Sequence, residues 1–232
     1  MYLRARSTDS APSPDGRELY EMIVRELPDC HESTIASLAD SARVRTVNRG
    51  GLILGQGERV ALTLMVDGHS IARRTTSDGQ HLISAVYPPG RLLGFSGIAP
   101  ILSAAELIAL TDCRIASWPG LKVRALAAAD PGLGLAAVDA LAASVHERME
   151  RAEWFLHQDA RRRVMRILAA HRDLFFEEPA LLDRTHLPGL VGTSREMTGR
   201  VLRYLEREGT VARVGRVGLR LLRPDRLDAG PT

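Results

Sequence analysis

The segment from Leu182 to Leu222 constrains the fold more than any other part of the chain. A short apolar stretch, "LDRTHLPGLVG", ends at Gly192, and a second helical pattern, "TSREMTGRVLRYLEREG", follows it directly and ends at Gly209. After these, "TVARVGRVGLRLL" alternates apolar and polar residues around a glycine turn, which is typical of a β-hairpin. Two helices joined by a tight glycine-containing turn and followed by a hairpin predict a winged helix-turn-helix.

The charges in the second of these helices give it two distinct faces. At about 100° per residue, Arg195, Glu196 and Arg200 fall on one face around Gly199, and the apolar positions fall opposite. Taken alone, such a face is usually just solvated, and Thr193 with Glu196 fits a capping box at the start of the helix. A guanidinium can, however, donate two hydrogen bonds to guanine, and a carboxylate can accept one from cytosine. Arg195, Glu196 and Arg200 are therefore candidate base-reading residues.

Positive charge is concentrated in the same part of the chain. Residues 158–232 contain 15 Arg against 10 Asp and Glu, whereas the remaining residues contain 16 basic against 18 acidic side chains, and the net charge of the whole is +3. Basic side chains favour a polyphosphate because they release its condensed counterions. GC-rich coding also produces an arginine excess, so both explanations stay open. The distribution is what binding to double-stranded DNA would require.

The N-terminal half is predicted to be mostly β. Short helices are expected over Glu18–Leu27 and Glu32–Ser41, and from Arg43 to Trp118 short apolar runs alternate with glycine-containing turns, typical of an all-β barrel or roll. Asp130-Pro131 then opens a long helix. The chain is therefore predicted to be α+β, with a flexible tail at 1–17, a β-roll at 18–129, a long helix at 130–157 and a winged helix-turn-helix domain at 158–232.

The long helix carries one apolar stripe that needs a partner. Its spacing of three and four residues is close to the seam of a coiled coil. The spacing alone does not decide whether the partner is the chain's own β-roll or the same helix of a second subunit. The stripe consists of Val138, Leu141, Val145, Met149, Ala152 and Phe155.

The order of these parts resembles the superfamily of bacterial transcription regulators typified by the cyclic-AMP receptor protein and the fumarate–nitrate regulator (CRP/FNR). The resemblance covers roughly residues 18–225 and is carried by "GTSREMTGRVLRYLEREG" with its hairpin and by "NRGGLILGQGERVALTLMVDG" in the β-rich half. It implies a homodimer in which 18–129 is an effector-type jelly roll of the cyclic-nucleotide-binding type, 130–157 is the dimerisation helix and 158–232 is the DNA-binding domain. RNA polymerase is a further partner that the resemblance implies.

The resemblance also assigns residues to DNA. The pattern from Arg195 to Arg200 matches the receptor-protein type position for position, which implies a TGTGA-like half-site repeated as a palindrome about one helical turn apart. Four further positions match those where members of the family touch phosphate, which would fix the register without reading sequence. They are Arg184, Thr185, Ser194 and Arg216.

The cyclic-nucleotide site that the resemblance implies is degenerate here. The family uses a Gly-Glu pair and, further along, an Arg-Ser pair that binds the cyclic phosphate, whereas this chain has Gly94-Phe95 and, at the second position, Ser103-Ala104. A buried phosphate without a guanidinium would be poorly compensated, so we expect no cyclic-AMP binding in the usual mode. The apolar "LLGFSGIAPIL" either fills the pocket or lines it for an unidentified hydrophobic effector.

Other classes of protein find little support in the sequence. Cys30 and Cys113 are too few and too far apart for a disulfide framework or an iron–sulfur cluster, and the histidines are scattered, so we expect no metal and no cofactor. No glycine-rich phosphate loop or nucleophile elbow is present, which argues against an enzyme. No apolar run approaches the ~20 residues of a membrane span and no signal peptide is visible, which predicts a cytoplasmic protein without a membrane partner.

Two alternatives remain at this point. Pro188-Gly189 falls inside the first helix of the motif, where proline removes a backbone donor, so we expect that helix to be short or kinked. A ligand-binding or dimerisation module with impaired DNA binding is therefore one alternative. A regulator that responds to an apolar small molecule is the other.

Overall fold

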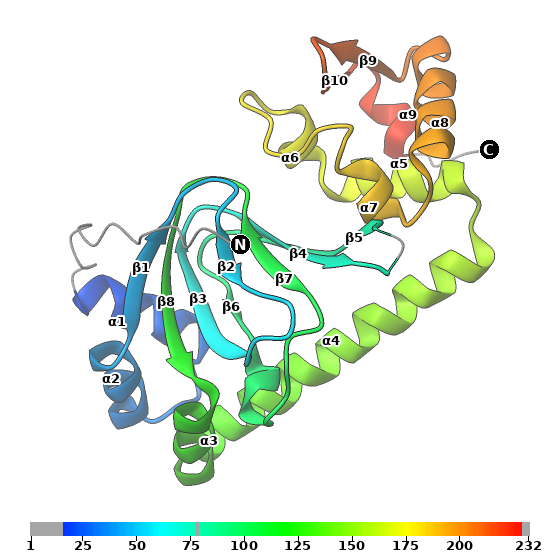
Figure 1. Cartoon of the computed structure of the whole chain (residues 1–232). Helices are drawn as coiled ribbons and strands as arrows, with labels where there is room; N and C mark the ends of the chain where they lie inside the picture. Colours follow the sequence, from blue (N-terminus) through cyan, green and yellow to red (C-terminus); the bar gives the residue numbers. More distant parts are fainter. Residues whose placement is uncertain (1–15, 78, 229–232) are drawn as a thin grey trace, which may run out of the picture. The chain divides into compact units, whose positions relative to one another are not determined.

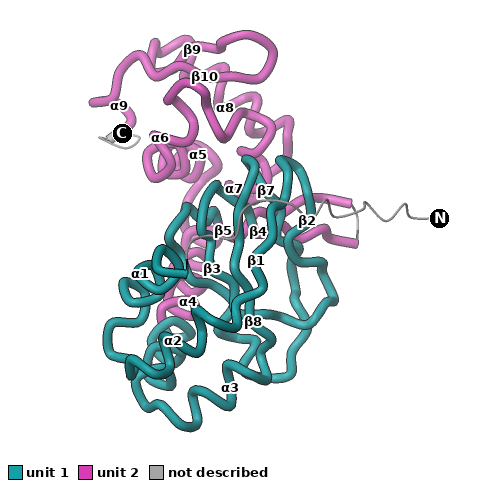
Figure 2. Tube along the Cα trace, turned by 90° about the vertical axis from the view of Figure 1, so that its left-hand side faces the viewer, with its two compact units in different colours: residues 1–71, 86–142 teal, residues 72–85, 143–232 magenta. Residues whose placement is uncertain are grey.

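The computed structural model describes residues 16–77 and 79–228, and the predicted tail at 1–17 lies almost entirely outside them. The chain divides into two compact units. The first contains residues 1–71 and 86–142, and the second contains residues 72–85 and 143–232 (Figure 2). The second unit therefore includes a β-hairpin from the middle of the β-rich half, which the sequence did not indicate.

Two four-stranded sheets form the β-rich half, as predicted for a β-roll (Figure 1). One sheet has the order β1-β8-β3-β6 and the other the order β2-β7-β4-β5, and the strands pair antiparallel wherever a register is defined. The strands are β1 (Arg43–Val47), β2 (Leu52–Leu54), β3 (Ala61–Asp67), β4 (Ser70–Thr75), β5 (His81–Tyr87), β6 (Leu92–Leu93), β7 (Glu106–Ala109) and β8 (Cys113–Pro119).

Helices cover the first of these sheets because its outward face is apolar. They are α1 (Gly16–Glu26), α2 (Glu32–Asp40), α3 (Gly120–Ala129) and the start of α4 (Pro131–His157). Leu62, Leu64 and Trp118 of the sheet pack into one buried cluster with Ile23 and Leu38 of the helices. The indole nitrogen of Trp118 donates to the carbonyl of Leu38 at 2.7 Å, so this buried polar group is satisfied. The helices α1 and α2 confirm the sequence-based expectation, whereas α3 was not predicted.

The interior between the two sheets is filled by a second apolar cluster. Met65 and Ile115 come from one sheet, and Ile53 and Leu107 from the other. Cys113 belongs to the same cluster, and burial raises the pKa of its thiol. This cysteine is therefore an unreactive core residue.

The long helix begins where the sequence indicates. The carboxylate of Asp130 accepts a hydrogen bond from the backbone nitrogen of Gly132 at 2.9 Å, which satisfies one of the first N–H groups of α4. Only Leu133 and Ala137 of its 27 residues are buried. The remainder of the helix is left with little apolar cover from its own chain.

The C-terminal part of the second unit is a winged helix-turn-helix, as predicted. Its elements are α5 (Ala160–Ala170), α6 (Arg172–Phe176), α7 (Leu187–Val191), α8 (Arg195–Arg207), β9 (Val211–Val214), β10 (Gly218–Leu221) and α9 (Pro224–Asp228). Val164, Leu168, Phe175 and Leu205 are fully or almost fully buried and form its core. The helices α5 and α6 are separated at His171, whose backbone leaves the helical region.

Candidate nucleic-acid interface

The helix α8 is anchored at its start by Ser194. The hydroxyl oxygen of Ser194 accepts a hydrogen bond from the backbone nitrogen of Met197 at 3.0 Å, so Ser194 is the N-cap residue. The predicted capping box of Thr193 with Glu196 was therefore wrong by one residue. Because Glu196 takes no part in capping, its carboxylate is available on the surface of the helix.

The predicted base-reading residues share an exposed face of α8. Arg195, Glu196 and Arg200 are all exposed, and the buried positions of the helix lie on its other side. A guanidinium nitrogen of Arg200 donates to the carboxylate of Glu196 at 2.8 Å. An exposed pair of this kind contributes little to stability, but it holds the two side chains next to each other.

One further arginine on this face was missed by the sequence analysis. Arg203 is exposed and lies one turn after Gly199, and a Cβ at Gly199 would lie 3.7 Å from the Nη1 atom of Arg203. That distance is an ordinary van der Waals contact, so the Arg203 side chain lies beside position 199 without requiring a glycine there. The i, i+4, i+8 spacing of Arg195, Gly199 and Arg203 was the signal that could have identified it.

The helix α7, which precedes α8, is short, as Pro188 led us to expect. It contains five residues, and Pro188 lies in its first turn, where a missing N–H group costs no intrahelical hydrogen bond. Gly192 ends the helix with φ of +65°, and a Cβ there would lie 2.2 Å from the ring of Phe155. The Pro188-Gly189 pair therefore does not prevent a complete helix-turn-helix from forming.

Four positions were assigned to phosphate contacts. A guanidinium nitrogen of Arg184 donates to the carbonyl of Arg216 at 2.7 Å, which ties the turn before α7 to the wing. Arg216 itself is exposed at the tip of the wing, between β9 and β10. The hydroxyl of Ser194 keeps its proton free to donate, since it only accepts in the cap. The hydroxyl of Thr185 instead donates its proton to Asp183, so a donation from Thr185 to phosphate would require that bond to break.

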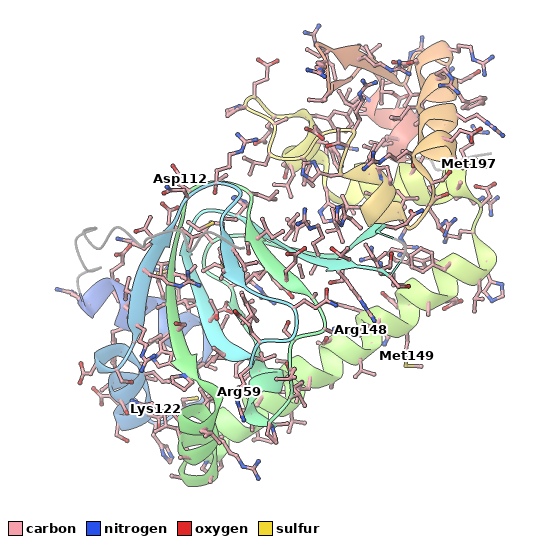
Figure 3. All side chains as sticks on the ribbon, viewed as in Figure 1. Arg59, Asp112, Lys122, Arg148, Met149 and Met197 are labelled. Atoms are coloured by element: carbon pink, nitrogen blue, oxygen red, sulfur yellow. The ribbon has the colours of Figure 1, made fainter. Side chains whose placement is uncertain are left out.

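The apolar stripe of α4 is exposed in this chain. Val138, Leu141, Val145 and Met149 all lie at the surface, with 67% of Met149 exposed (Figure 3). Ala152, the fifth predicted position, is exposed as well.

Phe155, the last predicted position, is 37% exposed and also contacts its own chain. Its ring lies 5.1 Å from the guanidinium carbon of Arg163 and packs against Gly192. Leu156 is 79% exposed and lies on the same helical face as Val138 and Val145. Steps of three and four residues are both compatible with a helical seam, so the sequence could not show whether Phe155 or Leu156 continues the stripe.

The predicted effector-pocket residues have different surroundings. Phe95, which follows Gly94 at the start of a short 3-10 helix (Phe95–Ile98), is buried in the apolar cluster under α1 and α2. Ser103 donates its hydroxyl proton to the carbonyl of Ala105, and Ala104 is exposed. Phe95 therefore occupies core volume at the position where the resemblance would place a glutamate.

Comparisons with solved structures identify the fold. The chain is similar to the c-di-GMP responsive global regulator CLP of Xanthomonas campestris, with 22% identity, a TM-score of 0.70 and coverage of 83% of this chain and 100% of that one. It is also similar to FixK2 of Bradyrhizobium japonicum (19% identity, TM-score 0.67, 81% and 96% covered). A transcriptional regulator of the CRP/FNR family from Thermus thermophilus, TTHA1359, matches with 22% identity, a TM-score of 0.67 and coverage of 81% and 97%. The chain has the CRP/FNR fold.

No family model and no curated protein matches the sequence. Within residues 16–77 and 79–228, no group of three or more His, Cys, Asp or Glu side chains is placed to hold a metal ion. None of the described helices is long and apolar enough to cross a membrane.

Proposed function

We propose that this chain is a homodimeric, sequence-specific transcription regulator that reads DNA with α8. The observation that carries this proposal is the single exposed face formed by Arg195, Glu196 and Arg200 on a capped helix of a winged helix-turn-helix. These groups are donors and acceptors of the type that discriminate G·C pairs in the major groove. The target proposed from the resemblance is a TGTGA-like palindrome.

The ion pair between Glu196 and Arg200 supports this assignment. Their 2.8 Å contact holds both side chains beside each other before DNA arrives. Because an exposed pair contributes at most about 1 kcal/mol, this contact lowers the entropic cost of fixing the two side chains in the groove only slightly. Arg203 extends the same face and supplies a further cation for a phosphate or a base.

The exposed stripe of α4 supports the second part of the proposal. A helix that leaves Val138, Leu141, Val145 and Met149 in water is stabilised when a second copy covers these side chains. A two-fold axis along the paired α4 helices gives each dimer two copies of α8 and so requires an inverted repeat in the DNA. RNA polymerase is a partner that only the family resemblance supports.

The β-roll is proposed not to bind cyclic AMP in the usual mode. Phe95 is buried in the core where the resemblance would place a carboxylate, and neither Ser103 nor Ala104 can supply a guanidinium for the phosphate. The packed residues between the two sheets support a filled interior rather than a pocket for a hydrophobic effector. Isothermal titration with cyclic AMP and cyclic GMP tests the proposal that the β-roll does not bind cyclic AMP in the usual mode. Micromolar binding of either nucleotide would refute that proposal.

The DNA-binding proposal is tested by fluorescence anisotropy with a labelled TGTGA palindrome. We expect Arg195→Ala to lose about 1–3 kcal/mol of discrimination at one base pair of each half-site. Arg216→Ala, on the wing, should weaken binding to all sequences about equally and should lower the salt dependence. If Arg195→Ala leaves every base preference unchanged, the assigned role of α8 is wrong.

A further inference from the structure

The guanidinium of Arg151 joins three segments of the second unit that are far apart in the sequence. Its Nη2 atom donates to the carbonyls of Ile83 at 2.6 Å and Leu190 at 2.7 Å, and its Nη1 atom donates to the carbonyl of Ser84 at 2.9 Å. Residues 83 and 84 belong to β5, residue 190 belongs to α7, and Arg151 lies on α4. We call this set of contacts the Arg151 bridge.

The acceptors of the Arg151 bridge are groups that need a donor. Leu190 is in the last turn of α7, where carbonyl groups have no partner within the helix. The strand β5 is at the edge of its sheet, so one side of its backbone has no neighbouring strand. Because successive carbonyls of a strand point to opposite sides, this applies to one of the carbonyls of Ile83 and Ser84. An arginine presents several N–H groups in a fixed fork and can satisfy three carbonyls at once, which a lysine cannot do with the same geometry.

The packing at Gly189 is further evidence that α7 and β5 lie close together. A Cβ at Gly189 would lie 2.9 Å from the carbonyl oxygen of His81 and 3.1 Å from the Cγ1 atom of Ile83. Glycine is therefore required for β5 to come this near to α7. The hairpin residues 72–85 and residues 143–232 belong to the same compact unit (Figure 2).

The bridge fixes the helix-turn-helix to the end of α4. The covalent connection between α4 and α5 consists only of residues 158 and 159, so contacts around it help to set the direction of the helix-turn-helix. The guanidinium of Arg166 on the ring of Trp154 is one such contact, and the Arg151 bridge is the contact that reaches α7. The helix α7 is followed after three residues by α8, so holding α7 also holds the base-reading helix. None of the bridging atoms lies on the exposed face of α8, and that face stays free to meet DNA.

We infer that Arg151 is a positioning residue for DNA recognition, which orients α7 and α8 on the end of α4 through the backbone of β5. This inference rests on the proposed function. It assigns to the Arg151 bridge the role of setting the direction of the two α8 helices in a dimer. A palindrome demands that both helices have defined directions at the same time. A single half-site makes no such demand. Loss of the bridge therefore weakens binding to the palindrome and leaves binding to one half-site unchanged.

The test compares Arg151→Gln with Arg148→Gln, a matched control one turn earlier on α4. Arg148 is exposed and its only hydrogen bond in the described structure is a 3.5 Å contact with Ser144 on its own helix. We expect Arg151→Gln to bind the palindrome about tenfold more weakly, which is the effect of reordering about one backbone residue per dimer. Its affinity for an isolated half-site should remain that of the wild type, and its discrimination against palindromes with two extra central base pairs should decrease. Arg148→Gln should match the wild type in all three measurements.

Gly189→Ala provides a second variant that disturbs the same contact without removing charge. Alanine favours a helix over glycine, so any loosening must come from the clash with β5. We expect this variant to show the same selective loss as Arg151→Gln. Equal or tighter binding of both variants to the palindrome overturns the inference, and so does a parallel loss on the half-site, which would indicate a role in folding alone.

Amide hydrogen exchange separates failure of this inference from failure of the proposed function. In the absence of DNA, Arg151→Gln should accelerate exchange in residues 81–87 and 187–193, and Arg148→Gln should not. If exchange is accelerated but the wild-type protein is indifferent to DNA sequence, the bridge exists and the proposed function is wrong. If exchange is unchanged, the bridge does not hold the two segments and the inference fails.

Discussion

The stripe on α4 gives a prediction whose size can be worked out from exposure. Val145 is 57% exposed in the single chain, and full burial of such a side chain contributes about 2 kcal/mol. Covering the remainder in a dimer therefore contributes about 1 kcal/mol per subunit. A two-fold axis doubles this to about 2 kcal/mol per dimer. Val145→Glu removes that contribution and also leaves two carboxylates at the seam, so we expect the dimer dissociation constant to rise more than about 30-fold.

Sedimentation equilibrium over a range of concentrations measures this change. Glutamate is at least as good a helix former as valine, so α4 itself should persist, and circular dichroism checks that it does. Leu121→Glu is the matched control, because Leu121 is 72% exposed on α3, away from the stripe. A Val145→Glu protein that dimerises as strongly as the wild type would show that the stripe is not the dimer interface, and so would an equal loss in Leu121→Glu.

Three further predictions concern stability. Ser194→Ala should lower the unfolding free energy of the winged helix-turn-helix by about 1 kcal/mol in urea titrations, and Thr193→Ala should not, since only Ser194 caps α8. Phe175→Ala should cost about 3–5 kcal/mol in the same assay because Phe175 is fully buried; a loss below 1 kcal/mol would contradict its place in the core. A hydrogen bond from Thr34 lowers the pKa of Asp130, although burial acts in the opposite direction. The ionised carboxylate therefore stabilises the fold fully at neutral pH, and this stabilisation is lost as the pH falls through about 4 and below. In acid titrations, the unfolding free energy of Asp130→Asn should fall less steeply than that of the wild type.

The sequence predicted the elements whose signals are local. The glycine turns and alternating strands gave the β-roll, Asp130-Pro131 gave the start of α4, and the helix-turn-helix was evident from its spacing. The error at the start of α8 concerned a single residue. Thr193 and Ser194 can both cap a helix, and the sequence does not show which residue first leaves the helical backbone conformation.

The remainder depended on contacts between distant segments. Nothing in the sequence near Arg151 indicates that its guanidinium meets the backbone of Ile83 and Leu190, because backbone carbonyls carry no sequence signal. For the same reason Gly189 could only be read as a weak helix former, although its small size is what admits β5. Periodicity likewise could not show that Phe155 contacts Gly192 of its own chain.

The central claim is that paired copies of α8 read DNA sequence through Arg195, Glu196 and Arg200. Selection of bound duplexes from a random pool by the full-length wild-type protein tests it most directly. The account predicts enrichment of an inverted repeat with half-sites centred about 10 base pairs apart, and no enriched motif for the variant with all three residues changed to alanine. Recovery of unrelated sequences by the wild type, or the same motif from the triple variant, would contradict it.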